Sequence, residues 1–143
     1  MPFPIPEAGL VISYSYLWRY EHESGVEEGR KNRPCVIILS VEKQAGDIIV
    51  TVAPITHYEP KDKKFGIEIP IGVKKHLRLD NKKSWVIISE VNQFIWPGYD
   101  LRPIVGSKKK FAYGFLPPML FEQIKSEILK LIVKRRTNLT SRN

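Results

Sequence analysis

The chain has 143 residues, of which 43% are hydrophobic, so it is long enough for one compact domain whose core needs no disulfide support. Its single cysteine, Cys35, excludes an internal disulfide and a cysteine-built metal site, and no apolar run or signal pattern predicts a membrane span or secretion, so we expect a soluble, cytoplasmic protein. The net charge of +8 favours a polyanionic partner, such as nucleic acid or an acidic protein.

The first part of the chain predicts three strands and one long loop. Residues 11–18 alternate between large apolar side chains and serines, which predicts a strand with one buried face. The charged stretch 19–32 follows, and we expect it to be a long functional loop. Residues 35–41 and 48–56 are rich in β-branched side chains and flank the turn sequence KQAGD, so they predict a β-hairpin. Within it, Cys35 is expected to be a small buried hydrophobe.

The middle of the chain predicts shorter and less regular elements. We expect strands within residues 66–73, 84–91 and 109–117, a basic connection at 74–83 that holds one helical turn at most, and an irregular segment at 94–103 that is broken by prolines.

Only the end of the chain has a helical period. Apolar side chains recur at three- and four-residue steps over about 118–135, which predicts a helix, and residues 136–143 predict a frayed tail. Together the elements predict a single domain over residues 1–143 that is mainly β with a C-terminal helix. Five or six short antiparallel strands at about 9–116 would form a small barrel, and the helix would close it.

Several sequence motifs that bind nucleotides or metal ions are absent. It contains no G-x-x-x-x-G-K-[ST] phosphate loop, no G-x-G-x-x-G motif and no H-E-x-x-H motif. The three histidines, His22, His57 and His76, are far apart, with no carboxylate at a metal-ligand spacing. We therefore expect no metal site and no cofactor.

Polar residues at strand ends are the remaining candidates for a site. Arg33 precedes the first strand of the predicted hairpin, and Thr56 and His57 end the second, so the open end of the hairpin would bring Arg33 close to Thr56. An arginine there could bind a phosphate and stabilise charge on its oxygens, and the threonine hydroxyl could donate a further hydrogen bond. His57 suits proton transfer, and Glu28 in the preceding loop could orient the arginine or accept a proton.

Each of these residues also has a purely structural interpretation. Arg33 can be a solvated loop charge or half of a surface ion pair, Thr56 can bond to nearby backbone at the strand end, and His57 can be an exposed loop residue. Glu90 ends a later apolar strand and can be a structural ion-pair partner. The residues alone leave both interpretations open.

The segments G…VISYSYLW, EEGRKNRPCVIIL, VAPIT and SWVIISE together resemble the MazF/PemK-like toxins of bacterial type II toxin-antitoxin systems. The later segments EVNQFIWPGYDLRP and YGFLPP resemble the growth-inhibitor branch of that family. The resemblance covers about residues 9–135. It implies an SH3-like barrel with a C-terminal helix, a homodimer, and metal-independent cleavage of single-stranded RNA. It also implies a cognate antitoxin, which we expect to lay an acidic, partly disordered segment along the basic groove of the dimer.

By position, the resemblance implies that Arg33 and Thr56 are catalytic and that Glu28 matches the acid of the preceding loop. Glu90 falls near an acid that some members use. Ile88 stands where some relatives have an arginine, so we hypothesise that His57 takes over its part in proton transfer. The implied reaction is attack of the ribose 2′-hydroxyl on the adjacent phosphate, which leaves a 2′,3′-cyclic phosphate and a free 5′-hydroxyl. Arg33 would stabilise the pentacovalent phosphate and could protonate the leaving oxygen.

Two other functions are compatible with the same sequence. The barrel could serve as a non-catalytic RNA- or protein-binding module, or as a structural dimer whose basic surface only aids solubility. Cleavage of single-stranded RNA in excess chelator, lost in Arg33→Ala, would distinguish the enzyme from both.

Overall fold

The computed structural model describes residues 3–19, 32–107, 110–134 and 138–142. Within these ranges the elements in chain order are β1 (Leu10–Tyr14), β2 (Arg33–Glu42), β3 (Ile48–Thr56), a 3-10 helix (Lys63–Phe65), β4 (Gly66–Glu68), α2 (Ile71–His76), β5 (Trp85–Ile87), β6 (Glu90–Ile95), β7 (Ala112–Phe115), α3 (Pro118–Val133) and β8 (Asn138–Ser141).

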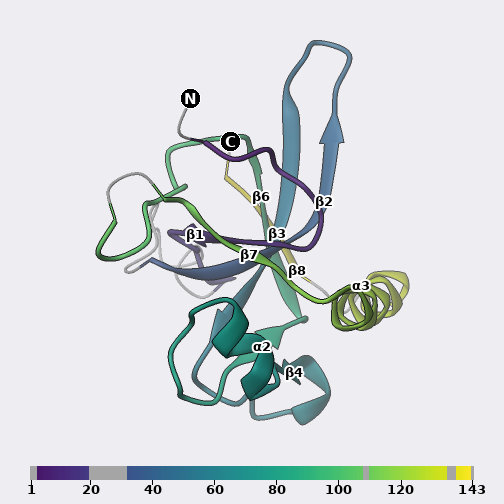
Figure 1. The fold of residues 1–143 in the computed structure, drawn as a ribbon. Helices are drawn as coiled ribbons and strands as arrows, with labels where there is room; N and C mark the ends of the chain where they lie inside the picture. The colour runs from purple at the N-terminus through teal and green to yellow at the C-terminus, as the bar shows by residue number, and fades with distance from the viewer. Residues whose placement is uncertain (1–2, 20–31, 108–109, 135–137, 143) are drawn as a thin grey trace.

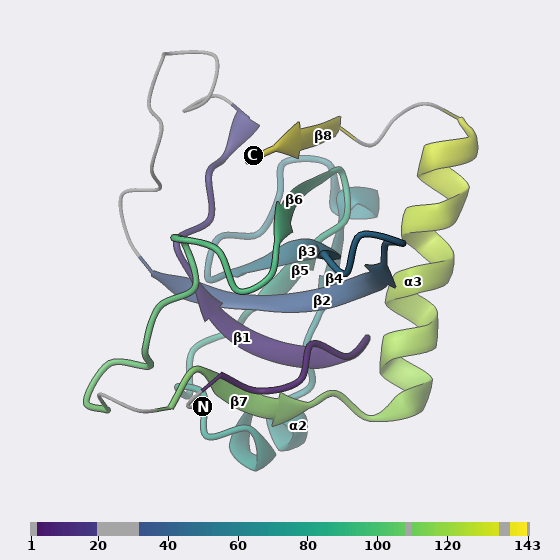
Figure 2. The ribbon, with the colours of Figure 1, turned by 90° about the horizontal axis from the view of Figure 1, so that it is seen from above.

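Strand β3 joins two parts of a strongly bent sheet. Its residues 49–52 pair with β6, its last two residues pair with β5, and β2 lies along its other edge. The strand order is β4-β5-β3-β2-β1-β7, with β6 branching from β3 and β8 pairing with β6. Figure 1 shows the β2–β3 hairpin rising from the body, and Figure 2 shows α3 running along one side of the bent sheet.

Alternate residues of the central strands face two separate hydrophobic clusters. One cluster contains Val11 and Val36 and packs against the buried face of α3, whose Ile124 is fully buried. The other contains Ile12 and Ile37 and lies on the opposite face of the sheet. The strand period of two therefore supplies side chains to both clusters, so the central strands are buried on both faces.

The prediction of one exposed face on the first strand was wrong. Ser13 and Ser15 are only 2% and 3% exposed. Their backbone N–H groups donate to the carbonyl oxygens of Phe111 and Asp100 along the strand edge, and on the side-chain face the Ser13 hydroxyl donates to the carbonyl oxygen of Pro103 at 3.4 Å, so later segments of the chain satisfy these polar groups. The strand also ends at Tyr14, earlier than predicted.

Two of the predicted middle elements have different boundaries. The predicted strand at 66–73 contains only β4, because α2 begins at Ile71 directly after Pro70, which suits the entry to a helix but not the interior of a strand. The predicted strand at 84–91 is divided between β5 and β6, which pair with different parts of β3.

The tail that was predicted to be frayed contains β8. This strand pairs in parallel with β6, which raises the number of strands in the described ranges to eight and breaks the predicted all-antiparallel order. Arg142 anchors it through an ion pair with Asp100 at 2.9 Å and a hydrogen bond of 3.0 Å to Oδ1 of Asn92. The prediction failed because every partner of β8 is distant in sequence.

The predicted fold class is confirmed: the chain is mainly β, barrel-like, and carries a C-terminal helix along one side. In the described ranges, no helix has the length and apolar character needed to cross a membrane.

Candidate functional site

The open end of the β2–β3 hairpin carries a pocket of about 360 Å³. Arg33 begins β2 and Thr56 ends β3, and the predicted pairing of the two strands is confirmed by a register that sets Cys35 opposite Pro54. Continued by two residues, this register sets Arg33 level with Thr56. Both residues line the pocket, together with Asn32, Pro34, Ile55, His57, Tyr58, Arg78, Leu79, Asp80, Ser84, Ile104, Val105 and Tyr113.

Arg33 has hydrogen-bonding capacity that no described residue uses. Its guanidinium carbon lies 4.9 Å from the centre of the Trp18 ring, so the indole supports one face of the group. Its buried Nε has no hydrogen-bond partner among the described residues. A buried guanidinium N–H without a partner is costly, so the arrangement favours an anionic ligand at this position.

Arg33 also separates two hollows. A second pocket of about 430 Å³ shares Arg33, Thr56 and Tyr58 with the first and is otherwise lined by Trp18, Glu59, Pro60 and Ile87. A chain-like ligand crossing Arg33 could therefore place one unit in each hollow, and the aromatic rings of the second hollow suit a nucleobase.

Thr56 has both a structural and a chemical capability. Its side chain is buried, and its Oγ1 accepts a hydrogen bond of 3.2 Å from the N–H of Tyr58, as expected for a threonine at a strand end. The hydroxyl can still donate its own hydrogen, because a hydroxyl is both a donor and an acceptor. Thr56 therefore bonds to nearby backbone at the strand end, and its hydroxyl is still able to donate a hydrogen bond to a ligand.

His57 has a carboxylate partner that the sequence analysis missed. Its Nε2 lies 2.5 Å from Oδ2 of Asp80, and Oδ1 of the same carboxylate lies 2.6 Å from Nζ of Lys74. Burial acts to raise the pKa of Asp80, but hydrogen bonds from Lys74, from the Lys82 N–H and from His57 outweigh it and hold that pKa below its ordinary value. Asp80 is therefore an ionised partner for the imidazole at neutral pH.

Arg78 adds a second guanidinium to the lining of the first pocket. It follows the end of α2 with a φ of 58°, a left-handed conformation that glycine adopts most easily. Its N–H donates to the carbonyl of Lys75, and the N–H of Leu79 donates to that of Lys74, so the turn is held by the hydrogen bonds of a helix end. Tyr113 faces the same pocket, and its pKa is raised by burial.

Of the other predicted site residues, the structure describes Glu90, which lies outside this pocket. Glu90 lines neither hollow; its Oε1 accepts hydrogen bonds from the Tyr16 hydroxyl at 3.1 Å and from the Arg19 N–H at 3.0 Å. It therefore anchors the segment after β1 through hydrogen bonds. Glu28 lies outside the described residues. Cys35 is fully buried, as predicted, and burial raises the pKa of its thiol.

One signal in the sequence could have found Asp80. It is the only carboxylate in residues 74–83, among five lysines and arginines, and a lone acid in so basic a stretch has many possible partners. Its pairing with His57, 23 residues earlier, depends on the fold and not on local spacing. In the described ranges, no group of three or more His, Cys, Asp or Glu is arranged to hold a metal ion.

The fold and the pocket define a small β barrel with a basic site at the open end of a hairpin. Residues 16–95 match the family described as PemK-like, MazF-like toxin of type II toxin-antitoxin system. The match covers more than half of the chain, and the chain belongs to this family. A comparison with curated proteins gave no match.

Proposed function

We propose that this toxin is an endoribonuclease that cuts single-stranded RNA by internal attack of a ribose 2′-hydroxyl, without a metal ion. One observation carries the proposal: an arginine with an unused buried donor, a threonine hydroxyl and a carboxylate-bound histidine line a single pocket. These are the groups that such a reaction requires, namely an anion stabiliser, a further donor and a proton acceptor.

Each group has a distinct role in the proposed reaction. His57 removes the proton of the 2′-hydroxyl, the 2′-oxygen bonds to phosphorus, and the bond from phosphorus to O5′ breaks. Arg33 and Thr56 donate hydrogen bonds to the phosphate oxygens as negative charge grows on them. Because a guanidinium keeps its protons in proteins, O5′ takes its proton from water in the open pocket, and the hydroxide that remains takes the proton held by His57, which returns the imidazole to its neutral form. The products are a 2′,3′-cyclic phosphate and a free 5′-hydroxyl.

The decisive experiment compares Arg33→Ala with the wild type on single-stranded RNA in excess chelator. We expect chelator-resistant cleavage with a cyclic-phosphate end in the wild type, and a loss of about a hundredfold or more in the variant, typical of removing a group that stabilises transition-state charge. Arg102→Ala is the control, because Arg102 lines neither hollow and has the same charge. RNA binding without cleavage by the wild type would instead support the non-catalytic binding module.

A type II toxin family implies an antitoxin partner. We propose that this partner is acidic, because the toxin has a net charge of +8, and that both act in the cytoplasm, where RNA substrates are made. Since the RNA site is basic as well, an acidic antitoxin segment can compete with RNA for it.

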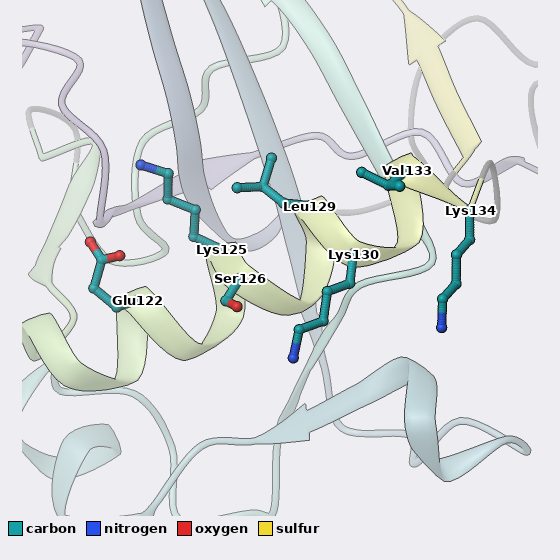
Figure 3. Close-up of a pocket in the computed structure, with 7 residues that line it drawn as sticks. All are labelled: Glu122, Lys125, Ser126, Leu129, Lys130, Val133 and Lys134. Atoms are coloured by element: carbon teal, nitrogen blue, oxygen red, sulfur yellow. The ribbon is translucent and has the colours of Figure 1, made fainter.

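We also propose a homodimer, on the basis of an apolar surface along α3. Leu129, Ile132 and Val133 are 50%, 50% and 83% exposed. Figure 3 shows Leu129 and Val133 projecting from the same side of the helix as Lys125, as residues four apart do. A groove of about 420 Å³ beside them is lined by further apolar side chains, including Leu39 and Leu139. Contiguous apolar surface of this kind marks an interaction site in a soluble protein.

A further inference from the structure

Lys74 is a charged side chain in the protein interior. It lies on α2 and is only 1% exposed, which is unusual for a lysine unless it is paired. Its Nζ donates to Oδ1 of Asp80 and to the backbone carbonyl of Lys82. An apolar side chain at such a position often gives equal or greater stability than a buried ion pair, so stability alone does not account for a lysine here.

The two carboxylate oxygens of Asp80 have different hydrogen-bond partners. Oδ1 accepts from Nζ of Lys74 at 2.6 Å and from the N–H of Lys82 at 3.0 Å. Oδ2 then faces Nε2 of His57 at 2.5 Å. Because two donors fix one oxygen, the carboxylate cannot rotate without breaking both bonds, and the other oxygen stays directed at the imidazole.

An ionised carboxylate can only accept, so Nε2 of His57 must carry the hydrogen in this bond. A neutral imidazole has one N–H, so Nδ1 then has the lone pair and is the nitrogen able to take a proton. The other charged or titratable groups that line the pocket around the imidazole are Arg33 on β2, Arg78 after α2, Tyr58 beside His57 and Tyr113 on β7. Among these groups and Asp80, only Asp80 is an acid that is ionised at neutral pH.

We infer that Lys74 and Asp80 are positioning residues that hold His57 in the Nε2–H tautomer, so that Nδ1 accepts the proton of the RNA 2′-hydroxyl. This inference rests on the proposed ribonuclease function. Lys74 touches no substrate; it acts by fixing Asp80, which in turn fixes the imidazole, as second-layer hydrogen bonds orient the base in other hydrolytic sites.

A double-mutant cycle on RNA cleavage separates positioning from general support of the fold. We expect His57→Ala to lower kcat about a hundredfold and Lys74→Met to lower it about tenfold with little change in KM. In the His57→Ala background, Lys74→Met should have no further effect, because its effect passes through the imidazole. Lys75→Met is the matched control on the same helix, since Lys75 is exposed, and it should retain wild-type cleavage. A full tenfold loss from Lys74→Met in the absence of His57 would overturn the inference.

The tautomer can be measured without any ribonuclease activity. Nitrogen-15 chemical shifts of the imidazole at alkaline pH, assigned by their loss in His57→Ala, report which ring nitrogen carries the hydrogen. We expect the Nε2–H form in the wild type and a mixture in Asp80→Asn, with a smaller change in Lys74→Met. An Nδ1–H form in the wild type, or no change in Asp80→Asn, would overturn the inference. Failure of the wild type to cut RNA would instead overturn the proposed function, whatever the tautomer.

Discussion

Asp80 connects the pocket to the interior of the protein, because one of its oxygens faces His57 and the other faces the buried Lys74. The pKa of Asp80 is lowered in the folded state, where hydrogen bonds from Lys74, Lys82 and His57 outweigh the effect of burial. A carboxylate with a lowered folded-state pKa stabilises the fold above its unfolded-state pKa of about 3.9. That contribution is lost as the pH falls through the folded-state pKa.

We therefore predict that Asp80→Asn destabilises the protein more at neutral pH than in acid. At about pH 7 the loss in free energy of unfolding should be on the order of 1–2 kcal/mol, less than for a fully buried pair, because solvent screens a side chain that is 43% exposed. The difference from wild type should shrink below about pH 4, measured by urea unfolding across the pH range. Asp47→Asn, an exposed turn residue, is the control and should change stability by less than about 0.5 kcal/mol.

The catalytic candidates differ in how far sequence could locate them. Arg33 and Thr56 could be placed close together because they lie at the open end of one hairpin, although a register shift between Ile37 and Leu39, which the sequence did not predict, sets which residue of β3 is level with Arg33. The sequence could not locate the partner of His57, because Asp80, with Lys74 bound to it, comes close to the imidazole only after α2 and the following connection fold against the end of β3. Glu90 was predicted to end an apolar strand, but that strand ends at Ile87 and Glu90 begins β6. Its Oε1 accepts hydrogen bonds from the Tyr16 hydroxyl and the Arg19 N–H, outside the pocket.

At the scale of elements, local pattern was sufficient for β2, β3 and α3, whose predicted positions agree with the structure to within a few residues. These elements have long runs of a single period, which is the strongest signal a sequence carries. Local pattern was insufficient for β1, where distant segments bury the serine face, and for β8, whose parallel pairing with β6 has no local signal.

We predict that β8 contributes to stability, in contrast to a frayed tail. Deleting residues 138–143 should lower the free energy of unfolding by about 3–5 kcal/mol, because it removes a buried ion-pair partner and leaves Asp100, which is 13% exposed, without Arg142. Urea unfolding measures the change. Arg142→Met should reproduce much of the loss, whereas Ser141→Ala, on the exposed part of the same strand, should change stability by less than about 0.5 kcal/mol. A deletion with no effect would show that the tail is dispensable.

At the scale of the whole molecule, charge and apolar surface are distributed for two different partners. The pocket at the hairpin mouth carries arginines, whereas α3 and the neighbouring strands expose leucine, isoleucine and valine. The pocket suits a polyanion, and the apolar surface suits a protein. Composition revealed the excess of positive charge, but the apolar surface became visible only when β2, α3 and β8 were brought side by side.

We predict that the apolar surface along α3 mediates the proposed homodimer. Leu129→Asp combined with Ile132→Asp should convert a species of two chains into one of a single chain, because two charges would lose their hydration in the contact. Light scattering coupled to gel filtration measures the mass. Met119→Asp is the control, since Met119 is 88% exposed on the same helix but does not line the groove beside it. A wild type that is monomeric at all concentrations tested would refute the prediction.

The backbone conformation at Arg78 favours glycine, whereas its side chain contributes a cation to the pocket. At a φ of 58°, glycine would relax the turn by on the order of 1 kcal/mol, yet it would remove a cation from the wall of the pocket. A population of variants selected only to withstand heat would therefore accumulate Arg78→Gly, whereas one selected for the proposed RNA cleavage would keep the arginine if its cation contributes to binding the phosphates. The residue found at this turn would therefore indicate whether selection acted more strongly on stability or on activity.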